Sequence, residues 1–324
     1  MKTQVGCAGI LVSDTFCGPM QELPREGQLL AVDSLPTKAG GCAANVAVDL
    51  ARQDIAVDVV GCLGKDSSAQ VLVSSLEQAG VGCSRIVYSN ELPTSKTVIL
   101  LVKGQDRRYI HSFGANAAFT VGHIDREWIK SLKVFYLGGL FLMPAFLPDE
   151  FIDLLTFCRR QGVITVVDVV IPQNAASKAA LPANLEPLLC AVDYFLPNDD
   201  EARAITGYSY PQEQLRTLLS WGANTVFITQ GRRGVLAGKG KEFWQAGVYE
   251  IDPVVDPSGS GDAFAAGVVT GIMRSWDLPT TLRFASALGA SAIRALGTTD
   301  GVFSTSQAET FLAAQRLDIQ SGNL

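Results

Sequence analysis

A glycine-rich stretch at residues 256–264, Asp-Pro-Ser-Gly-Ser-Gly-Asp-Ala-Phe, places small residues and a carboxylate where a helix is expected to begin. It follows an extended segment at 249–255, and the expected helix runs from 261 to about 274. Backbone N–H groups in the first turn of a helix have no partners within the helix, and the helix dipole adds partial positive charge there. Gly259, Ser260 and Gly261 are therefore predicted to form an anion hole for a transferring phosphoryl group.

Asp262 closes this stretch and is the predicted general base. The N–H groups of the helix start favour its ionised form, so we expect a carboxylate that is deprotonated at pH 7 and can accept the proton of a hydroxyl. Phosphoryl transfer depends mainly on positioning and charge stabilisation, so one base beside an anion hole is a sufficient minimal set. The same residues also fit an ordinary turn with a helix-capping carboxylate, and this stretch alone does not exclude that interpretation.

A second stretch of small residues, Ala-Gly-Gly-Cys-Ala-Ala-Asn at 39–45, leads into a helix expected over 43–53. Gly40 and Gly41 would let substrate oxygens approach bare backbone, and the amide of Asn45 offers both donors and acceptors to a polyol. Asp14 follows the first expected strand, and ligands of open α/β sheets bind at the carboxyl ends of parallel strands. The alternatives are a helix start packed with small residues and, for Asp14, a simple turn.

Two further motifs follow expected strands. Asn198 and Glu201 stand three residues apart at a helix start, so they project from one side of its first turn and are suited to Mg²⁺ bound through water. The same pair is also the pattern of a capping box. Thr229 and Gly231 lie at a glycine-bearing turn suited to contacts with phosphate or ribose, although a plain hairpin needs no ligand. The sequence has no Walker A motif and no Gly-x-Gly-x-x-Gly motif after the first strand.

The elements that must position these residues alternate along the chain. Apolar, β-branched runs typical of buried parallel strands occur at residues 5–11, 57–61, 134–137, 163–170, 194–196 and 225–229. Helical patterns occur at residues 43–53, 69–79, 149–161, 212–221, 261–274 and 280–296. This alternation predicts an α/β fold, a three-layer sandwich in which a mostly parallel central sheet lies between two layers of helices.

Two segments break the alternation. Residues 16–37 lack a helical period and contain Pro19, Pro24 and Pro36, whereas residues 97–102 and 107–113 have the pattern of a two-stranded hairpin. We expect these segments to form a small sheet that projects from the main one and acts as a lid, over about 14–38 and 96–114. Because no linker separates the lid, residues 1–324 are predicted to form a single domain.

The composition limits the classes of partner. The 324 residues carry a net charge of -6 with no basic block, which argues against nucleic acid, because binding to its phosphate backbone needs clustered Lys and Arg. The seven cysteines form no Cys-x-x-Cys pair and the two histidines lack zinc-like spacing, so we expect reduced thiols in a cytoplasmic protein without structural zinc. The longest apolar stretch, 134–148, is too short and too interrupted to cross a bilayer, so no membrane partner is expected.

Taken in order along the chain, these motifs resemble those of the PfkB, or ribokinase-like, carbohydrate kinase family, and the resemblance covers essentially the whole length. Residues 39–45 are similar to the N-terminal signature of the family, and residues 256–264 are similar to its C-terminal signature. The Asn198 and Glu201 pair resembles the magnesium and phosphate motif, and residues 229–231 resemble the nucleotide loop. The resemblance implies ATP-dependent, Mg²⁺-dependent transfer of a phosphoryl group to a hydroxyl of a sugar or related polyol.

The resemblance also implies roles for individual residues. Asp262 would be the general base beside the anion hole. The sugar contacts would be Asp14, Gly40, Gly41, Asn45 and Asn116. The nucleotide contacts would be Asn198, Thr229, Gly231, Ala287 and Ser291, with Glu201 holding Mg²⁺ through water. The positions where many relatives hold K⁺ correspond to Asp256, Ser258, Ala292, Ala295, Gly297 and Gly301. The lid would also form a homodimer interface.

Three departures from the family pattern bear on specificity. Pro257 and Ser260 replace the usual Thr and Ala, Gly138 and Gly139 stand where ribokinase carries an acidic sugar contact, and residues 168–170, Asp-Val-Val, replace Asp-Pro-Asn. The last two argue against ribose and fructose as the acceptor. A nucleoside or a sugar phosphate is the alternative acceptor, with Lys96, Arg107 and Arg108 beside or on the lid as candidate phosphate contacts. A non-catalytic sugar or nucleotide sensor is a further alternative, disfavoured because the base and the glycines are intact.

Overall fold

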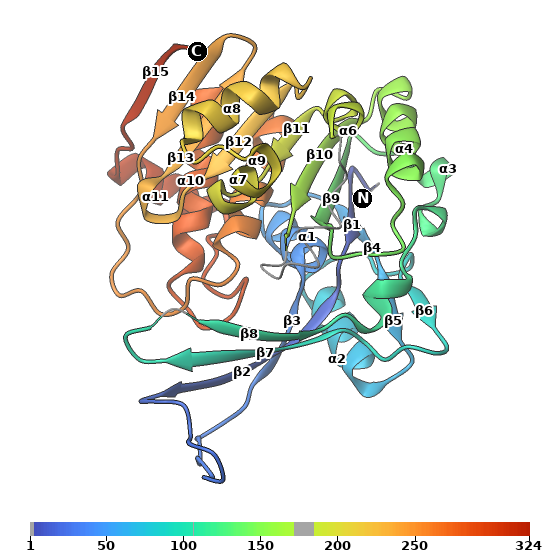
Figure 1. Ribbon diagram of the computed structural model, residues 1–324, viewed down its shortest axis with the longest axis vertical. Coiled ribbons are helices and arrows are strands. Elements are labelled where there is room, and N and C mark those ends of the chain that lie inside the picture. The colour runs from blue at the N-terminus through green and yellow to red at the C-terminus, as the bar shows by residue number, and fades with distance from the viewer. Residues whose placement is uncertain (1–2, 106, 172–184) are drawn as a thin grey trace.

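The computed structural model describes residues 3–105, 107–171 and 185–324. Its centre is a nine-stranded sheet with the order β15-β14-β13-β12-β11-β10-β9-β1-β4 (Figure 1). The parallel strands are β4 (Val57–Val60), β1 (Val5–Gly9), β9 (Val134–Leu140), β10 (Ile164–Val169), β11 (Tyr194–Leu196) and β12 (Thr225–Thr229). Three antiparallel strands extend one edge: β13 (Val235–Lys239), β14 (Glu242–Ala246) and β15 (Ile319–Asn323).

The six predicted strands are all present, because each is an apolar run that is covered on both faces. All residues of β1 and β9 are buried, as the continuous runs predict for central parallel strands. The first strand is shorter than expected: it ends at Gly9, whose φ of 137° suits glycine, and the chain then leaves the main sheet. Residues 249–255 form no strand, and Val255 instead donates a backbone hydrogen bond of 2.8 Å to Ile293.

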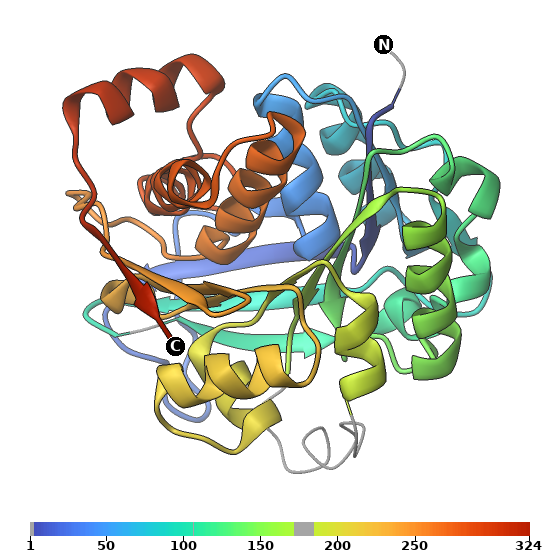
Figure 2. The same cartoon turned by 90° about the horizontal axis from the view of Figure 1, so that it is seen from above.

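Helices cover both faces of this sheet, which confirms the predicted three-layer α/β/α architecture (Figure 2). One face carries α1 (Cys42–Arg52), α2 (Ser67–Gln78), α9 (Ser260–Met273) and α10 (Leu278–Ala292), with α11 (Thr305–Ala314) packed outside α10. The opposite face carries α3 (Arg126–Ile129), α4 (Pro148–Arg160), α6 (Glu186–Ala191), α7 (Asp199–Thr206) and α8 (Pro211–Ser220). Within the described ranges, no helix is both long enough and apolar enough to cross a membrane.

A separate four-stranded sheet, which we call the lid sheet, lies below the main sheet in Figure 1. Its strand order is β3 (Thr37–Gly40), β2 (Val12–Met20), β7 (Lys96–Val102) and β8 (Arg108–Ser112). Strand β2 pairs in parallel with β7, and the two outer pairs are antiparallel. These strands come from the two segments predicted to form the lid, although the first begins at Val12 rather than near residue 14. A further small sheet pairs β5 (Cys62–Gly64) with β6 (Val87–Ser89).

The position of α9 is fixed by close contact with α10. A Cβ added to Gly267 would lie 2.9 Å from the Cβ of Ala285, and one added to Gly271 would lie 2.6 Å from a methyl carbon of Thr281. Both glycines therefore allow the two helix backbones to approach closely, as the alanine- and glycine-rich composition of this region predicts. This packing holds the N-terminus of α9 beside α1, where the two glycine-bearing motifs meet.

Candidate active site

The loop before α9 is fixed on one side and open on the other. Gly259 is the N-cap residue of α9, with a φ of 78° in the left-handed region that favours glycine. A Cβ at this position would overlap the carbonyl oxygen of Thr298 and lie 2.7 Å from its Cα. A Cβ at Gly261, in contrast, would have nothing within 4 Å among the described residues. The helix start therefore has bare backbone facing open space, the arrangement that an anion hole requires.

Asp262 lies in the first turn of α9, and its side chain contacts α1. Nδ2 of Asn45 donates a hydrogen bond of 2.7 Å to Oδ2 of Asp262, across 217 residues of sequence. Oδ1 of Asn45 accepts a 2.7 Å hydrogen bond from the hydroxyl of Thr298. The predicted base and the predicted sugar-binding motif thus lie in one place. Thr298 connects them to the loop before α9, because its side chain bonds to Asn45 and its backbone packs against Gly259.

The groups that shift the pKa of Asp262 are not the ones expected from the sequence. Burial raises the pKa of Asp262 above its ordinary value, and hydrogen bonds from Asn45 and Cys42 partly oppose this rise. The expectation that helix N–H groups determine its ionisation is wrong, because side chains of α1 are its hydrogen-bond partners. A base with a raised pKa holds a proton more readily, which suits a group that must accept one from an alcohol.

Asp14 lies over Gly40 at the junction of the lid sheet and α1. A Cβ at Gly40 would overlap the carboxylate of Asp14, and a Cβ at Gly41 would lie 2.5 Å from the carbonyl oxygen of Ile10. Both positions therefore require glycine, and Gly41 also has a φ of 91°. Burial raises the pKa of Asp14 to about 7, a hydrogen bond from Thr97 opposes this shift, and the nearby carboxylates of Asp262 and Asp256 add to it.

Because of this raised pKa, Asp14→Asn is expected to stabilise the protein at neutral and alkaline pH. A carboxyl whose pKa is raised on folding contributes stability that is fully present below its unfolded value, here 3.8, and is lost as the pH rises through about 7. The asparagine variant does not lose this contribution, so its free energy of unfolding should exceed that of the wild type by an amount that grows from pH 5 and levels off above 7. The limit is on the order of 4 kcal/mol. Urea unfolding at pH 5, 6, 7 and 8 measures the difference, and curves that stay parallel would contradict it.

Three residues that were not among the predicted site residues lie beside Asp262. Ligand atoms of Cys42, Asp168 and Asp262 all lie within 4.8 Å of one another. The hydroxyl of Tyr136 donates a 3.2 Å hydrogen bond to Oδ2 of Asp168. Asp168 belongs to the stretch 168–170 that departs from the family pattern, and like Asp14 it lies near the carboxyl end of a buried parallel strand. Cys42 lies inside the recognised motif at 39–45, whereas nothing in the sequence marks Tyr136.

The two predicted nucleotide motifs lie next to each other. Asn198 forms an isolated bridge with Thr229, and the N–H of Thr229 donates to the carbonyl of Pro197 at 3.1 Å. The capping-box alternative for Asn198 and Glu201 is confirmed: each side chain accepts a backbone hydrogen bond from the other residue, at 2.9 and 2.8 Å. Burial raises the pKa of Glu201 to about 7, and its charge helps to raise that of Asp168. Gly231, with a φ of 56°, begins the 3₁₀ turn Gly231–Arg233.

Three residues that were predicted to contact a ligand bond to, or pack against, other parts of the protein. The amide of Asn116 is buried and bonds to both backbone groups of Leu11, at 3.1 Å to its N–H and 3.0 Å to its carbonyl. Ser291 donates to the carbonyl of Leu288 at 2.7 Å and accepts from the N–H of Phe303 at 3.0 Å. Ala287 is fully buried in the helical layer. These contacts give all three residues a role in the packing of the protein, and their contacts with a ligand stay predictions.

The positions that correspond to a K⁺ site fit that ion incompletely. Asp256 is buried, and its two carboxylate oxygens accept hydrogen bonds from the N–H groups of Ser258 and Gly297, at 3.0 and 3.1 Å. The carbonyl of Gly301 accepts from the guanidinium of Arg294 at 2.7 Å. A side-chain cation therefore already occupies one of the predicted ligands. The complete set, with Ala292, Ala295 and Gly297, does not fit K⁺, and we carry no K⁺ into the proposed function.

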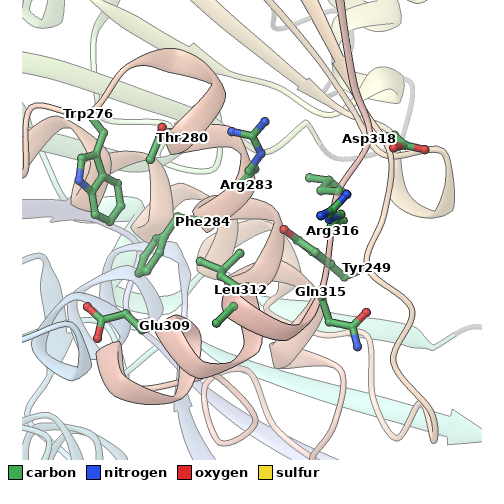
Figure 3. Close-up of a pocket in the computed structure, with 12 residues that line it drawn as sticks. Tyr249, Trp276, Thr280, Arg283, Phe284, Glu309, Leu312, Gln315, Arg316 and Asp318 are labelled. Atoms are coloured by element: carbon green, nitrogen blue, oxygen red, sulfur yellow. The ribbon is translucent and has the colours of Figure 1, made fainter.

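The structure also has a cavity that lies apart from these residues. About 620 Å³ in volume, it opens between α10, α11 and the segment before β15 (Figure 3). Apolar side chains such as Phe284 and Leu312 line it together with charged ones such as Arg283 and Arg316. None of the site residues predicted from the sequence lines this cavity, so we do not place the reaction there.

The chain is similar to several known kinases. The chain is 27% identical to the 2-dehydro-3-deoxygluconokinase of Bacillus subtilis, over 90% of this chain and 91% of that protein. It is 28% identical to the adenosine kinase of Saccharomyces cerevisiae, over 83% and 82% of the two chains. The solved structure of Arabidopsis thaliana ribokinase, complexed with ribose and ATP, superposes with a TM-score of 0.81 over 96% of this chain and 99% of that one, at 22% identity.

The family model settles the assignment that the resemblance suggested. The model of the pfkB family carbohydrate kinases matches residues 2–305. This match includes both glycine-bearing motifs, the Asn198 and Glu201 pair and the turn at Gly231. Since it spans nearly the whole chain, the protein belongs to the pfkB family of carbohydrate kinases.

Proposed function

We propose that the protein transfers the terminal phosphoryl group of ATP to a hydroxyl of a sugar or related polyol, with Asp262 as the general base. The observation that carries this proposal is the 2.7 Å hydrogen bond between Asn45 and Asp262. It places a carboxylate at the mouth of a bare helix start and next to a second glycine-bearing motif. These are the two components that phosphoryl transfer to an alcohol needs, a base for the hydroxyl and donors for the phosphate.

In the proposed reaction, the acceptor hydroxyl attacks the terminal phosphorus of ATP. A new bond forms between the acceptor oxygen and phosphorus, the bond from phosphorus to the bridging oxygen breaks, and ADP leaves with that electron pair. The hydroxyl proton passes to Asp262. Backbone N–H groups at Gly259, Ser260 and Gly261 stabilise the charge on the moving phosphoryl oxygens. Asp14, Gly40, Gly41 and Asn45 hold the acceptor.

The nucleotide would lie along the motifs that follow β11 and β12. Asn198, Thr229 and Gly231 are adjacent there, which supports a common role in contacting ATP. Glu201 is buried and forms no ion pair with a residue in the described part of the chain, so its carboxylate fits an ion held through water. Mg²⁺ at this position would supply charge neutralisation for the terminal phosphates.

The lid sheet supports two further parts of the proposal. It continues directly from β1 and leads directly into α1, so it is placed to close over the acceptor and exclude water. Strands β7 and β8 expose Val98, Tyr109 and Ile110, by 37%, 53% and 62%. Exposed apolar side chains on one small sheet favour a homodimer interface through the lid.

Among the alternatives, a nucleoside acceptor is supported by the similarity to an adenosine kinase. The lid arginines give less support to a sugar phosphate, because Arg108 donates to Gln105 at 2.6 Å and Arg107 contacts Tyr109.

An acceptor-dependent ADP-release assay tests the proposed function. The panel contains D-ribose, D-fructose, fructose 6-phosphate, 2-dehydro-3-deoxygluconate and adenosine, each with ATP and Mg²⁺. We expect ADP to form faster with at least one of these acceptors than with ATP alone, and formation to stop when Mg²⁺ is chelated. Binding of an acceptor without any ADP formation would instead support a sensor and contradict the proposal.

A further inference from the structure

The cavity between α10, α11 and the segment before β15 has a hydrogen-bond donor in its wall that no described residue satisfies. Tyr249 lines this cavity and is buried, with 6% of its surface exposed. Figure 3 shows its hydroxyl directed toward the side of the cavity where Arg283 and Leu312 lie. The hydroxyl has no hydrogen-bond partner in the described part of the chain. A buried hydroxyl without a partner costs free energy, which a hydrogen bond to a bound ligand would recover.

The apolar part of the lining is mainly aromatic. Phe284 is buried and packs edge to face against Trp276, with the ring centroids 5.0 Å apart. Tyr249 packs against Phe311 in the same geometry, also at 5.0 Å. Rings held in this way offer faces and edges to a flat aromatic body. The volume of about 620 Å³ lies within the range of small-molecule sites, about 300–1,000 Å³.

The charged part of the lining has an excess of positive charge. Arg283 on α10 and Arg316, just after α11, form no ion pair with any residue in the ranges 3–105, 107–171 and 185–324. Of the two carboxylates in the lining, that of Glu309 pairs with Arg274 at 3.8 Å. Only the carboxylate of Asp318 is then left against two guanidinium groups, so the cavity favours an anion.

One of these guanidinium groups lies near the unpartnered hydroxyl. Burial raises the pKa of Tyr249, and the positive charge of Arg283 opposes this rise. A guanidinium group offers donors in a planar fork that matches a carboxylate or a phosphate, and the phenol hydroxyl offers one more donor. An anion that binds Arg283 can therefore also accept a hydrogen bond from Tyr249.

We propose that this cavity binds a small organic anion, a carboxylate or phosphate carried on a flat aromatic body. The anionic group would bond to Arg283 and Arg316 and accept a hydrogen bond from Tyr249, and the aromatic body would lie against Trp276 and Phe284. The cavity shares no residue with the proposed active site, so the inference does not depend on the proposed function. Its lining on α11 and before β15 also lies beyond residues 2–305, the part of the chain that matches the family model.

Calorimetric titration of the full chain tests this site. The probes are 2-naphthoate and 2-naphthyl phosphate, and the comparison is 2-naphthamide, which has the ring and nearly the shape of the carboxylate without its charge. We expect at least one of the anions to bind at one site per chain, about 10-fold or more tightly than the amide. Arg283→Gln and Arg316→Gln should each weaken the binding of that anion by about 10-fold and leave the binding of the amide unchanged.

Tyr249→Phe separates a contact with the ligand from a purely structural role. The variant should bind the anion about 3- to 10-fold more weakly, because it lacks the donor. Its melting temperature without ligand should not fall, since the substitution removes a buried hydroxyl that has no described partner.

The control is Arg160→Gln on α4, which removes an exposed arginine on the opposite face of the sheet and should leave binding unchanged. The inference would be overturned if neither anion bound at millimolar concentrations, if the amide bound as tightly as the anions, or if both arginine variants bound the anion like the wild type. None of these results would affect the proposed function, which acceptor-dependent ADP release tests separately. Circular dichroism of each variant shows whether it is folded.

Discussion

Asp262→Asn is expected to lower kcat for acceptor-dependent ADP release by about 10²–10⁴-fold, the usual contribution of a positioned base. The amide has the size of the carboxyl and can still accept the hydrogen bond from Asn45, but it cannot take the hydroxyl proton. ATP binding should change little, because Asp262 contacts α1 and the predicted nucleotide motifs follow β11 and β12. Steady-state kinetics and calorimetric titration with ATP measure the two effects separately.

The stability of the same variant provides the control. Because burial raises the pKa of Asp262, its ionised form is costly in the folded protein, so the neutral amide should not lower the melting temperature at pH 8. Lost activity together with an unchanged or higher melting temperature would identify a functional residue. Turnover near that of the wild type would show that another group accepts the proton, and the mechanism proposed above would then be wrong.

Gly261→Ala should lower kcat by about 10²–10³-fold while leaving the protein folded, comparable to the loss of one donor of an oxyanion hole. An added Cβ would meet no atom of another segment within 4 Å among the described residues, and the position lies inside the first turn of α9, where alanine is favoured over glycine by about 0.5–1 kcal/mol. The added methyl group would extend into the open space where the phosphoryl group is expected. Kinetics and thermal unfolding of the variant should therefore give opposite results.

Gly259→Ala is the matched comparison. Here alanine would meet the backbone of Thr298 and would need the left-handed conformation, at a cost of about 1–2 kcal/mol for the conformation alone. We expect this variant to lose both activity and stability. Full activity in Gly261→Ala would mean that the phosphoryl group does not approach the helix start, and the anion hole would have to lie elsewhere.

The fold could be predicted from the sequence because the strands are continuous apolar runs and the helices have a helical pattern of apolar residues. All six apolar runs became parallel strands, and the alanine- and glycine-rich end of the chain became the close pair α9 and α10. The sequence did not predict where the chain leaves the main sheet and enters the lid sheet. The run at 5–11 reads as one strand, yet Gly9 ends it, since leaving the sheet depends on the pairing of Val12 with Gly40. That contact is between residues far apart in sequence and has no local signal.

The site was predictable to the extent that its residues lie in motifs. The two glycine-bearing stretches met as expected, because each forms a helix start at the same edge of the sheet. Thr298 and Tyr136 were not predictable, since their roles come from contacts across 253 and 32 residues. The buried amide of Asn116 satisfies its hydrogen bonds with the backbone of Leu11, a contact across 105 residues that the sequence did not predict, and its predicted sugar contact stays a prediction.

The junction between β3 and α1 has a consequence for how the enzyme would open. Strand β3 ends at Gly40 and α1 begins at Cys42, so a single residue, Gly41, separates the lid sheet from this helix. If the lid sheet closes as proposed, the backbone at this connection changes at residues that are proposed to hold the acceptor. Acceptor binding and the position of the lid sheet would then be coupled, so that lid opening and product release would occur together.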